Sequence, residues 1–126
     1  DMAAQADFAG LISGRDEDKF AALGLTPKTA EHVDAPYVAE CRAVIELRLL
    51  HTLALGSHTQ YIGEIMDVKV QSRYLDADGF PDMRRLDPLL YVPLAREYWS
   101  VGQIVAKAFS VGRSVDRRAV IGGDGS

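Results

Sequence analysis

Three polar side chains on one predicted β-strand could carry chemistry. His58, Gln60 and Glu64 are separated by even numbers of residues, so they share one face of an extended chain. The same face also carries the apolar residues Ile62, Met66, Val68 and Val70. Polar groups on an apolar strand face are costly unless a partner satisfies them. One alternative is a ligand in a pocket beside the strand. In the other, Glu64 pairs with an arginine or with backbone donors across the sheet, and His58 is solvated at the open end of a hairpin.

A second group of residues lies near the start of the chain. Ser13, Gly14 and Arg15 come directly before Asp16, at the start of a predicted helix. Glycine allows close approach, serine and the helix amides donate hydrogen bonds, and arginine pairs with phosphate. These residues are typical of an anion site. A plain helix cap, with Asp16 capping and Arg15 in solvent, is the alternative, and the residues alone favour it.

The other reactive residues lack a supporting pattern. Cys41 is the only cysteine, so no intramolecular disulfide is possible, and no nucleophile motif surrounds it. His51 stands alone on an apolar face, which is typical of a core or interface histidine. The segment 76–79 with Asp82 predicts a turn, because its spacing does not match a calcium loop. No metal site is expected, since no Cys/His spacing completes one.

A long β-hairpin must position the polar trio. Residues 42–55 alternate apolar and polar side chains, which predicts a strand with one buried face. Gly56 and Ser57 fit a two-residue turn, and residues 58–71 return antiparallel. Gly63, midway along the second strand, indicates a bulge or a close approach by backbone or ligand.

The rest of the chain predicts short elements. Helices are expected over residues 1–12, 16–23 (closed by Gly24), 82–87 and 102–110, the last with Ile104, Val105 and Ala108 inward. Short strands are expected around Tyr74, over 89–92 and over 97–101, and the strand over 89–92 is expected to be buried. Residues 25–36 are expected to form a connecting segment without regular structure. About four strands cannot cover a long hairpin. We therefore expect further strands from a missing segment, from another subunit, or from both.

Composition sets broad limits. The 126 residues predict one domain over 1–114, followed by a flexible tail over 115–126. A net charge of −4 argues against a nucleic-acid partner. No apolar run reaches the length of a membrane helix and no signal sequence opens the chain, so a cytoplasmic location without a membrane partner is expected.

Several segments, taken in order, resemble flavoredoxins of the flavin reductase-like, FMN-binding split-barrel family. The segments are SGRDEDKF at 13–20, GLTP at 24–27, DAPY at 34–37, HTQYIGEI at 58–65, LDADG at 75–79 and KAFSVGR at 107–113. Together they extend from about residue 1 to 114. The resemblance covers only the later part of the family, whose early strands have no counterpart here.

The resemblance implies a fold, a cofactor and site residues. The fold is mainly β with flanking helices, an antiparallel Greek-key split barrel apparently lacking its N-terminal strands, and a homodimer. FMN is bound non-covalently and NAD(P)H is the expected reductant, with a nicotinamide or a redox protein as partner. The residues implied near the cofactor are Ser13, Gly14, Arg15, Lys19 and Phe20, and His58 is implied near the flavin or nicotinamide as the catalytic residue.

We therefore expect an FMN-binding flavin reductase or a flavoredoxin-type electron-transfer protein. In this interpretation His58 positions the nicotinamide or stabilises developing charge, and Glu64 is structural. The rival interpretation is a non-catalytic dimerisation or binding module that has lost flavin binding.

Overall fold

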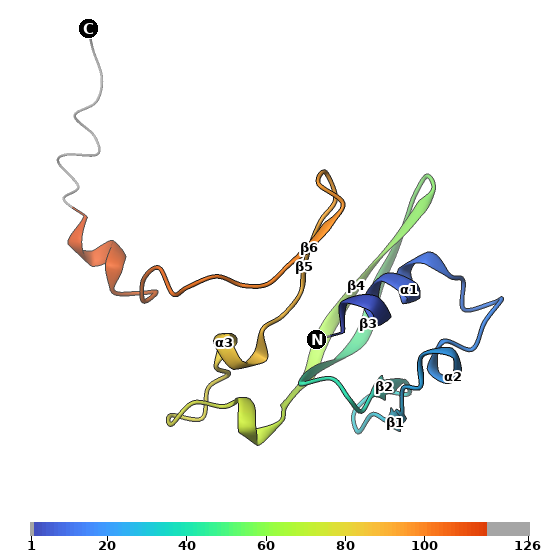
Figure 1. The fold of residues 1–126 in the computed structure, drawn as a ribbon, viewed down its shortest axis with the longest axis horizontal. Helices are drawn as coiled ribbons and strands as arrows, with labels where there is room; N and C mark the ends of the chain where they lie inside the picture. The colour runs from blue at the N-terminus through green and yellow to red at the C-terminus, as the bar shows by residue number, and fades with distance from the viewer. Residues whose placement is uncertain (1, 116–126) are drawn as a thin grey trace, which may run out of the picture.

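The computed structural model describes residues 2–115, and Figure 1 shows their arrangement. The helices are α1 (Ala3–Leu11), α2 (Lys19–Leu23) and α3 (Met83–Leu86), with 3-10 turns η1 (Ser72–Tyr74) and η2 (Val111–Ser114). The strands are β1 (Pro27–Thr29), β2 (Pro36–Val38), β3 (Ala43–Leu55), β4 (His58–Val70), β5 (Leu90–Val92) and β6 (Glu97–Trp99). They pair as three separate two-stranded antiparallel sheets, β1–β2, β3–β4 and β5–β6.

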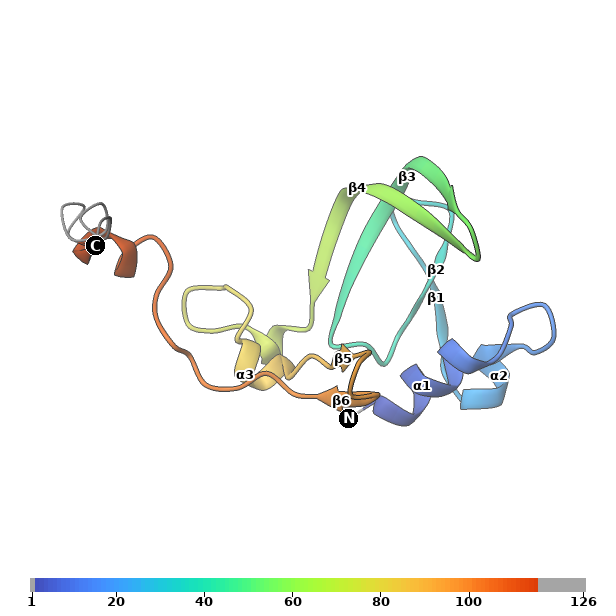
Figure 2. The same cartoon turned by 90° about the horizontal axis from the view of Figure 1, so that it is seen from above.

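The β3–β4 hairpin dominates the molecule and confirms the predicted strand pair. Each strand has 13 residues. Gly56 opens the turn with a φ of +61°, a backbone conformation that glycine adopts without steric cost. The hairpin is strongly curved, and α3 and the segment after β6 extend to one side of it (Figure 2).

Two bulges interrupt the hairpin. Glu46 pairs with Asp67 while Leu47 pairs with Ile65, so Met66 is an extra residue on β4. Further along, Leu50 is an extra residue on β3. Each bulge bends its strand and increases the local twist.

Gly63 lies beside the second bulge, as the sequence predicted. It is the partner of Leu49. A Cβ atom at this position would lie 3.0 Å from the Leu47 Cβ and 3.3 Å from the Arg48 carbonyl oxygen. The missing side chain therefore allows the two strands to approach each other closely.

The bulges change which side chains share a face. Because each extra residue shifts the alternation by one position, Val68 and Val70 lie on the face opposite to Glu64. The prediction that the polar trio shares its face with these two valines is therefore wrong. The trio does share a face with Ile62.

The apolar stripe passes from one face to the other along the hairpin. Near the base, Ile45, Leu47 and Ile65 lie on one face. Beyond the second bulge, Leu53 and Leu55 lie on the opposite face, which near the base carries charged side chains. Both apolar patches are exposed within the described part of the chain.

Helix α2 starts later than predicted, since its N-cap is Asp18 and not Asp16. The Asp18 carboxylate accepts hydrogen bonds from the amides of Phe20 (3.0 Å) and Ala21 (3.2 Å). Gly24 ends the helix with a φ of +62°, as predicted.

The β1–β2 ribbon lies in a segment predicted to be a plain connection. Its register runs from Pro27 opposite Val38 to Thr29 opposite Pro36. At its open end, the Glu40 carboxylate accepts hydrogen bonds from the Thr26 amide at 3.1 Å. The ribbon is too short and proline-rich to show strand periodicity in the sequence.

The predictions for the later part of the chain are partly wrong. Tyr74 ends a 3-10 turn and not a strand. β5 forms as predicted but is exposed, not buried. No helix forms over 102–110, where Ile104 and Val105 point into solvent, because a helix this short needs a packing partner. The one-turn helix α3 is confirmed. A hydrogen bond of 3.1 Å from the Tyr98 hydroxyl to Asp7 links the β5–β6 hairpin to α1.

The fold is open. Among residues 2–115 no hydrophobic side chain is buried, and Glu46 is the one buried residue, at 3% exposure. The chain is mainly β with few helices, as predicted, but the strands of the described region form no closed barrel. No helix in this region is long and apolar enough to cross a membrane. The tail prediction falls, apart from Val115, outside the described residues.

Candidate functional site

The loop between α1 and α2 forms a compact turn around Ser13. The Ser13 carbonyl oxygen accepts hydrogen bonds from the amides of Asp16 (3.1 Å) and Glu17 (3.3 Å). The Ser13 hydroxyl oxygen accepts one from the Arg15 amide at 3.2 Å. These local hydrogen bonds fix the backbone of the loop, and the side chains of residues 15–18 that follow are exposed.

This loop surrounds a shallow polar hollow of about 510 Å³, lined by Gly14 to Phe20. Arg15 is exposed, and within the part of the chain described here its guanidinium forms no ion pair or hydrogen bond. An unpaired guanidinium beside a glycine can take a phosphate or carboxylate. Asp16, Glu17 and Asp18 also line the hollow, so its charge is mixed.

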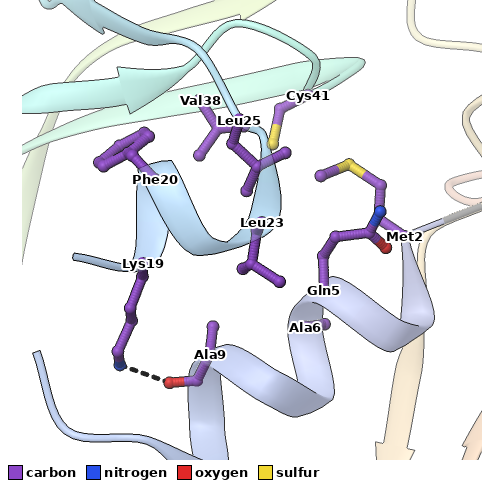
Figure 3. A pocket seen from close by; sticks show the side chains of 10 residues that line it. All are labelled: Met2, Gln5, Ala6, Ala9, Lys19, Phe20, Leu23, Leu25, Val38 and Cys41. Atoms are coloured by element: carbon purple, nitrogen blue, oxygen red, sulfur yellow. Dashed lines mark hydrogen bonds between the residues drawn. The ribbon is translucent and has the colours of Figure 1, made fainter. Parts of the chain in front are cut away.

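A second, apolar pocket of about 390 Å³ lies between α1, α2 and β2 (Figure 3). Its lining residues are Met2, Gln5, Ala6, Ala9, Lys19, Phe20, Leu23, Leu25, Val38 and Cys41. Lys19 and Phe20 line both the pocket and the polar hollow. The polar hollow and the apolar pocket therefore meet at Lys19 and Phe20.

Lys19 has a fixed position in this site. Its ammonium donates a hydrogen bond of 2.5 Å to the carbonyl oxygen of Ala9, near the C-terminal end of α1 (Figure 3). A cation at this end of a helix is favourable because the helix dipole is negative there. Lys19 thus fastens the two helices together.

The Cys41 thiol borders the apolar pocket (Figure 3). Burial, and then the nearby Glu40 carboxylate, raise the pKa of this thiol above its usual value. A thiol with a raised pKa is a poor nucleophile at neutral pH. The structure gives Cys41 a packing role at the pocket wall.

His58 lies apart from the loop. It is exposed directly after the hairpin turn, where its Nδ1 is 2.8 Å from the Ser57 hydroxyl. Both views place the β3–β4 turn and the α1–α2 loop at the same end of the molecule (Figures 1 and 2). No hydrogen bond or ion pair within residues 2–115 joins His58 to residues 13–20.

The structure therefore brings together five of the six predicted site residues. Ser13, Gly14 and Arg15 lie in the α1–α2 loop and Lys19 and Phe20 begin α2, whereas His58 stands separately. His51 is exposed in the outer half of the hairpin, so it lies in no core of the described chain, and the alternative of an interface histidine stays a prediction.

Glu64 forms an ion pair with Arg48 on the neighbouring strand. This contact is the cross-strand alternative that the sequence offered for Glu64. Sequence reasoning missed a different acid, Glu46. Its place on the polar side of the β3 alternation gave no sign that it would be buried.

Comparison with known proteins gives a family. Residues 1–100 match the flavin reductase like domain family. A solved structure of flavoredoxin from Desulfovibrio vulgaris (Miyazaki F) superposes with a TM-score of 0.82 at 55% identity, covering 88% of this chain and 59% of that one. Flavoredoxin from Methanosarcina acetivorans superposes with a TM-score of 0.77 at 31% identity, covering 90% and 59%.

A third solved structure bears on the fold. A Shewanella frigidimarina protein with a split barrel domain superposes with a TM-score of 0.65 at 28% identity, covering 86% of this chain and 56% of that one. The chain thus spans less than two thirds of each of these three proteins. Since the family match extends over 100 of the 126 residues, the chain belongs to the flavin reductase like domain family.

Proposed function

We propose that this chain is part of an FMN-binding flavin reductase or flavoredoxin-type electron carrier. It would take electrons from NAD(P)H through the flavin to an acceptor. Family membership supports a flavin-related redox function. The observation that carries the FMN assignment is the unpaired, exposed guanidinium of Arg15, next to Gly14 and Phe20.

The loop residues fit the two ends of FMN. The phosphate requires cationic or amide donors, and Arg15 beside Gly14 supplies them without losing an existing ion pair. The isoalloxazine ring requires apolar or aromatic surface, and Phe20 lies between the hollow and the apolar pocket. The three acids of the loop disfavour a second anion, which favours a single phosphate over a diphosphate.

The flavin, when bound, supplies the hydride-accepting chemistry, and the protein binds and orients it. In this proposal Arg15 holds the phosphate. Lys19 keeps α2 against α1 through Ala9, so that Phe20 presents its ring at the cavity edge. His58 orients the nicotinamide. This role requires the β3–β4 turn and the α1–α2 loop to lie on either side of the bound flavin and nicotinamide.

A homodimer belongs to the same proposal. Apolar side chains lie exposed on both faces of the hairpin, and contiguous exposed apolar surface often marks a protein interface. A second subunit would cover part of this surface. The proposal also includes a cytoplasmic location, because the single half-buried Cys41 suits a reducing compartment.

Flavin titration tests the proposal. The purified protein should gain flavin absorbance and quench FMN fluorescence on adding FMN. Arg15→Gln should weaken FMN binding about tenfold or more, because a hydrogen-bonded charge pair is lost. The same variant should bind riboflavin, which has no phosphate, as the wild type does.

Arg96→Gln is the matched control, because Arg96 is also an exposed arginine but lies in the β5–β6 turn. It should leave FMN binding unchanged. A protein that stays colourless and leaves FMN fluorescence unquenched would instead support the non-catalytic dimerisation or binding module.

A further inference from the structure

Glu46 on β3 is a buried carboxylate that contacts both the β1–β2 loop and β4. Its two carboxylate oxygens lie 3.2 Å from the Glu31 amide, and one lies 2.8 Å from the His32 amide. The Lys69 ammonium is 3.1 Å from Oε1, the carboxylate oxygen that the His32 amide does not bind. Every partner that a buried carboxylate needs is therefore present.

Four ionisable groups surround Glu46. Glu31 and His32 come from the β1–β2 loop, and Asp67 and Lys69 come from β4. Lys69 also pairs with Asp67 and with Glu31 at 3.4 Å, and the His32 Nε2 lies 3.9 Å from Asp67. On β3 itself the nearest charge on this face is Arg48, which is already paired with Glu64. We call Glu31, His32, Glu46, Asp67 and Lys69 the charge clip.

The charge clip joins the loop of the β1–β2 ribbon to the hairpin through the contacts of Glu46. No buried apolar side chain joins these two parts within residues 2–115. The ribbon and its flanks also carry Leu25 and Val38, which line the apolar pocket beside Phe20. The position of that pocket relative to the hairpin therefore depends on the clip.

We propose that Glu46 is the anchor of a charge clip that fastens the β1–β2 ribbon, and with it the wall of the apolar pocket, to the β3–β4 hairpin. Neutralising Glu46 removes the ion pair with Lys69 and weakens both amide hydrogen bonds at once. The ribbon is then released while its own pairing, held at the far end by Glu40 and Thr26, remains. Bound flavin is not required for this coupling.

Acid should release the clip. Burial alone would raise the pKa of Glu46, but the amides of His32 and Glu31 and the Lys69 ammonium together hold it below its usual value. Lys69 likewise lowers the pKa of Asp67. The clip is therefore fully formed above the ordinary carboxyl pKa of about 4 and is lost as the pH falls through the lower pKa of the folded state.

Amide hydrogen exchange measured by NMR tests the proposal. In Glu46→Gln the protection factors of the Glu31 and His32 amides should fall about tenfold or more, with amide shifts also moving at Val38 and Leu25. Glu40→Gln is the matched control, because Glu40 also binds a main-chain amide but forms no hydrogen bond or ion pair with the hairpin within residues 2–115. It should affect Thr26 and leave Glu31 and His32 unchanged.

Lys69→Met tests the same clip through its cation and covers the case in which Glu46→Gln does not fold. It should raise the pH at which the Glu31 and His32 amide shifts titrate. Unchanged protection of Glu31 and His32 in Glu46→Gln would overturn the proposal. An unchanged titration midpoint in Lys69→Met would overturn it as well.

Discussion

Arg48 and Glu64 are direct cross-strand partners, two residues before the extra residue Leu50 on β3. If every residue of the two strands, Leu50 and Met66 included, paired in the register of the base and the turn, Glu64 would lie opposite Leu49 and on the apolar face. The local shift of pairing between Met66 and Leu50 turns it toward Arg48 instead. An apparently misplaced carboxylate is thus matched to a cation by a change of register.

The first prediction concerns this ion pair. Both side chains are exposed, at 60% for Arg48 and 46% for Glu64, so Glu64→Gln should reduce the free energy of unfolding by less than about 1 kcal/mol. FMN affinity should not change. Urea unfolding and flavin titration measure the two effects. A large loss of flavin binding with stability intact would show that Glu64 belongs to the site.

The second prediction concerns Gly63. Gly63→Ala places a methyl group 3.0 Å from the Leu47 Cβ and 3.3 Å from the Arg48 carbonyl oxygen, so the strands must separate. We expect a loss of about 1–3 kcal/mol in the free energy of unfolding. The control is Gly10→Ala in α1, where nothing lies within 4 Å and alanine favours the helix by up to about 1 kcal/mol. Equal effects of the two substitutions would contradict the close approach.

The third prediction concerns His58. If it orients the nicotinamide, His58→Ala should slow NAD(P)H-dependent flavin reduction about tenfold or more, while FMN affinity changes little. Stopped-flow reduction and FMN titration separate the two quantities. His51→Ala is the control, because His51 is also exposed on the outer half of the hairpin. Parallel losses of reduction rate and affinity would mean that His58 only supports the fold.

The fourth prediction concerns the pH dependence of α3. Asp82 is its N-cap and accepts a hydrogen bond of 3.0 Å from the Arg84 amide. The Arg84 side chain holds the pKa of this carboxyl below its usual value, with further help from its amide and from Arg85. The stabilisation is therefore present above a pH of about 4 and is lost as the pH falls through the lower folded-state pKa.

Asp82→Asn should remove this pH dependence while keeping a capping side chain. Amide exchange of residues 84–87 between pH 2 and 6 measures it. Asp87→Asn is the control, because Asp87 follows the helix and does not cap its start. An identical acid response in wild type and Asp82→Asn would rule out Asp82 as the titrating group.

Local signals were enough for part of this fold. Alternation over 42–55 and the turn at Gly56 predicted the long hairpin, and Gly24 predicted the end of α2. These features depend on residues close in sequence. The capping residue of α2 was misassigned because three successive positions, Asp16 to Asp18, are acidic and each could cap a helix.

Features that depend on distant contacts could not be predicted. The β1–β2 ribbon is too short to show periodicity, and the burial of Glu46 depends on Lys69 and on the amide of His32. The helix expected over 102–110 had suitable residues but meets no packing surface in the described region. The His58 side chain has the chemistry of a site, yet only a bound ligand or a second subunit could join it to the loop.

The two extra residues of the hairpin compensate for each other. Met66 is inserted on β4 and Leu50 on β3, so the pairs at the base and at the turn follow one register, and only three pairs between them are displaced. Met66 shifts the pairing by one residue, and Leu50 shifts it back. Deleting either one alone would remove one bulge and leave the other, whereas deleting both would give a continuous ladder in which Glu64 still lies opposite Arg48.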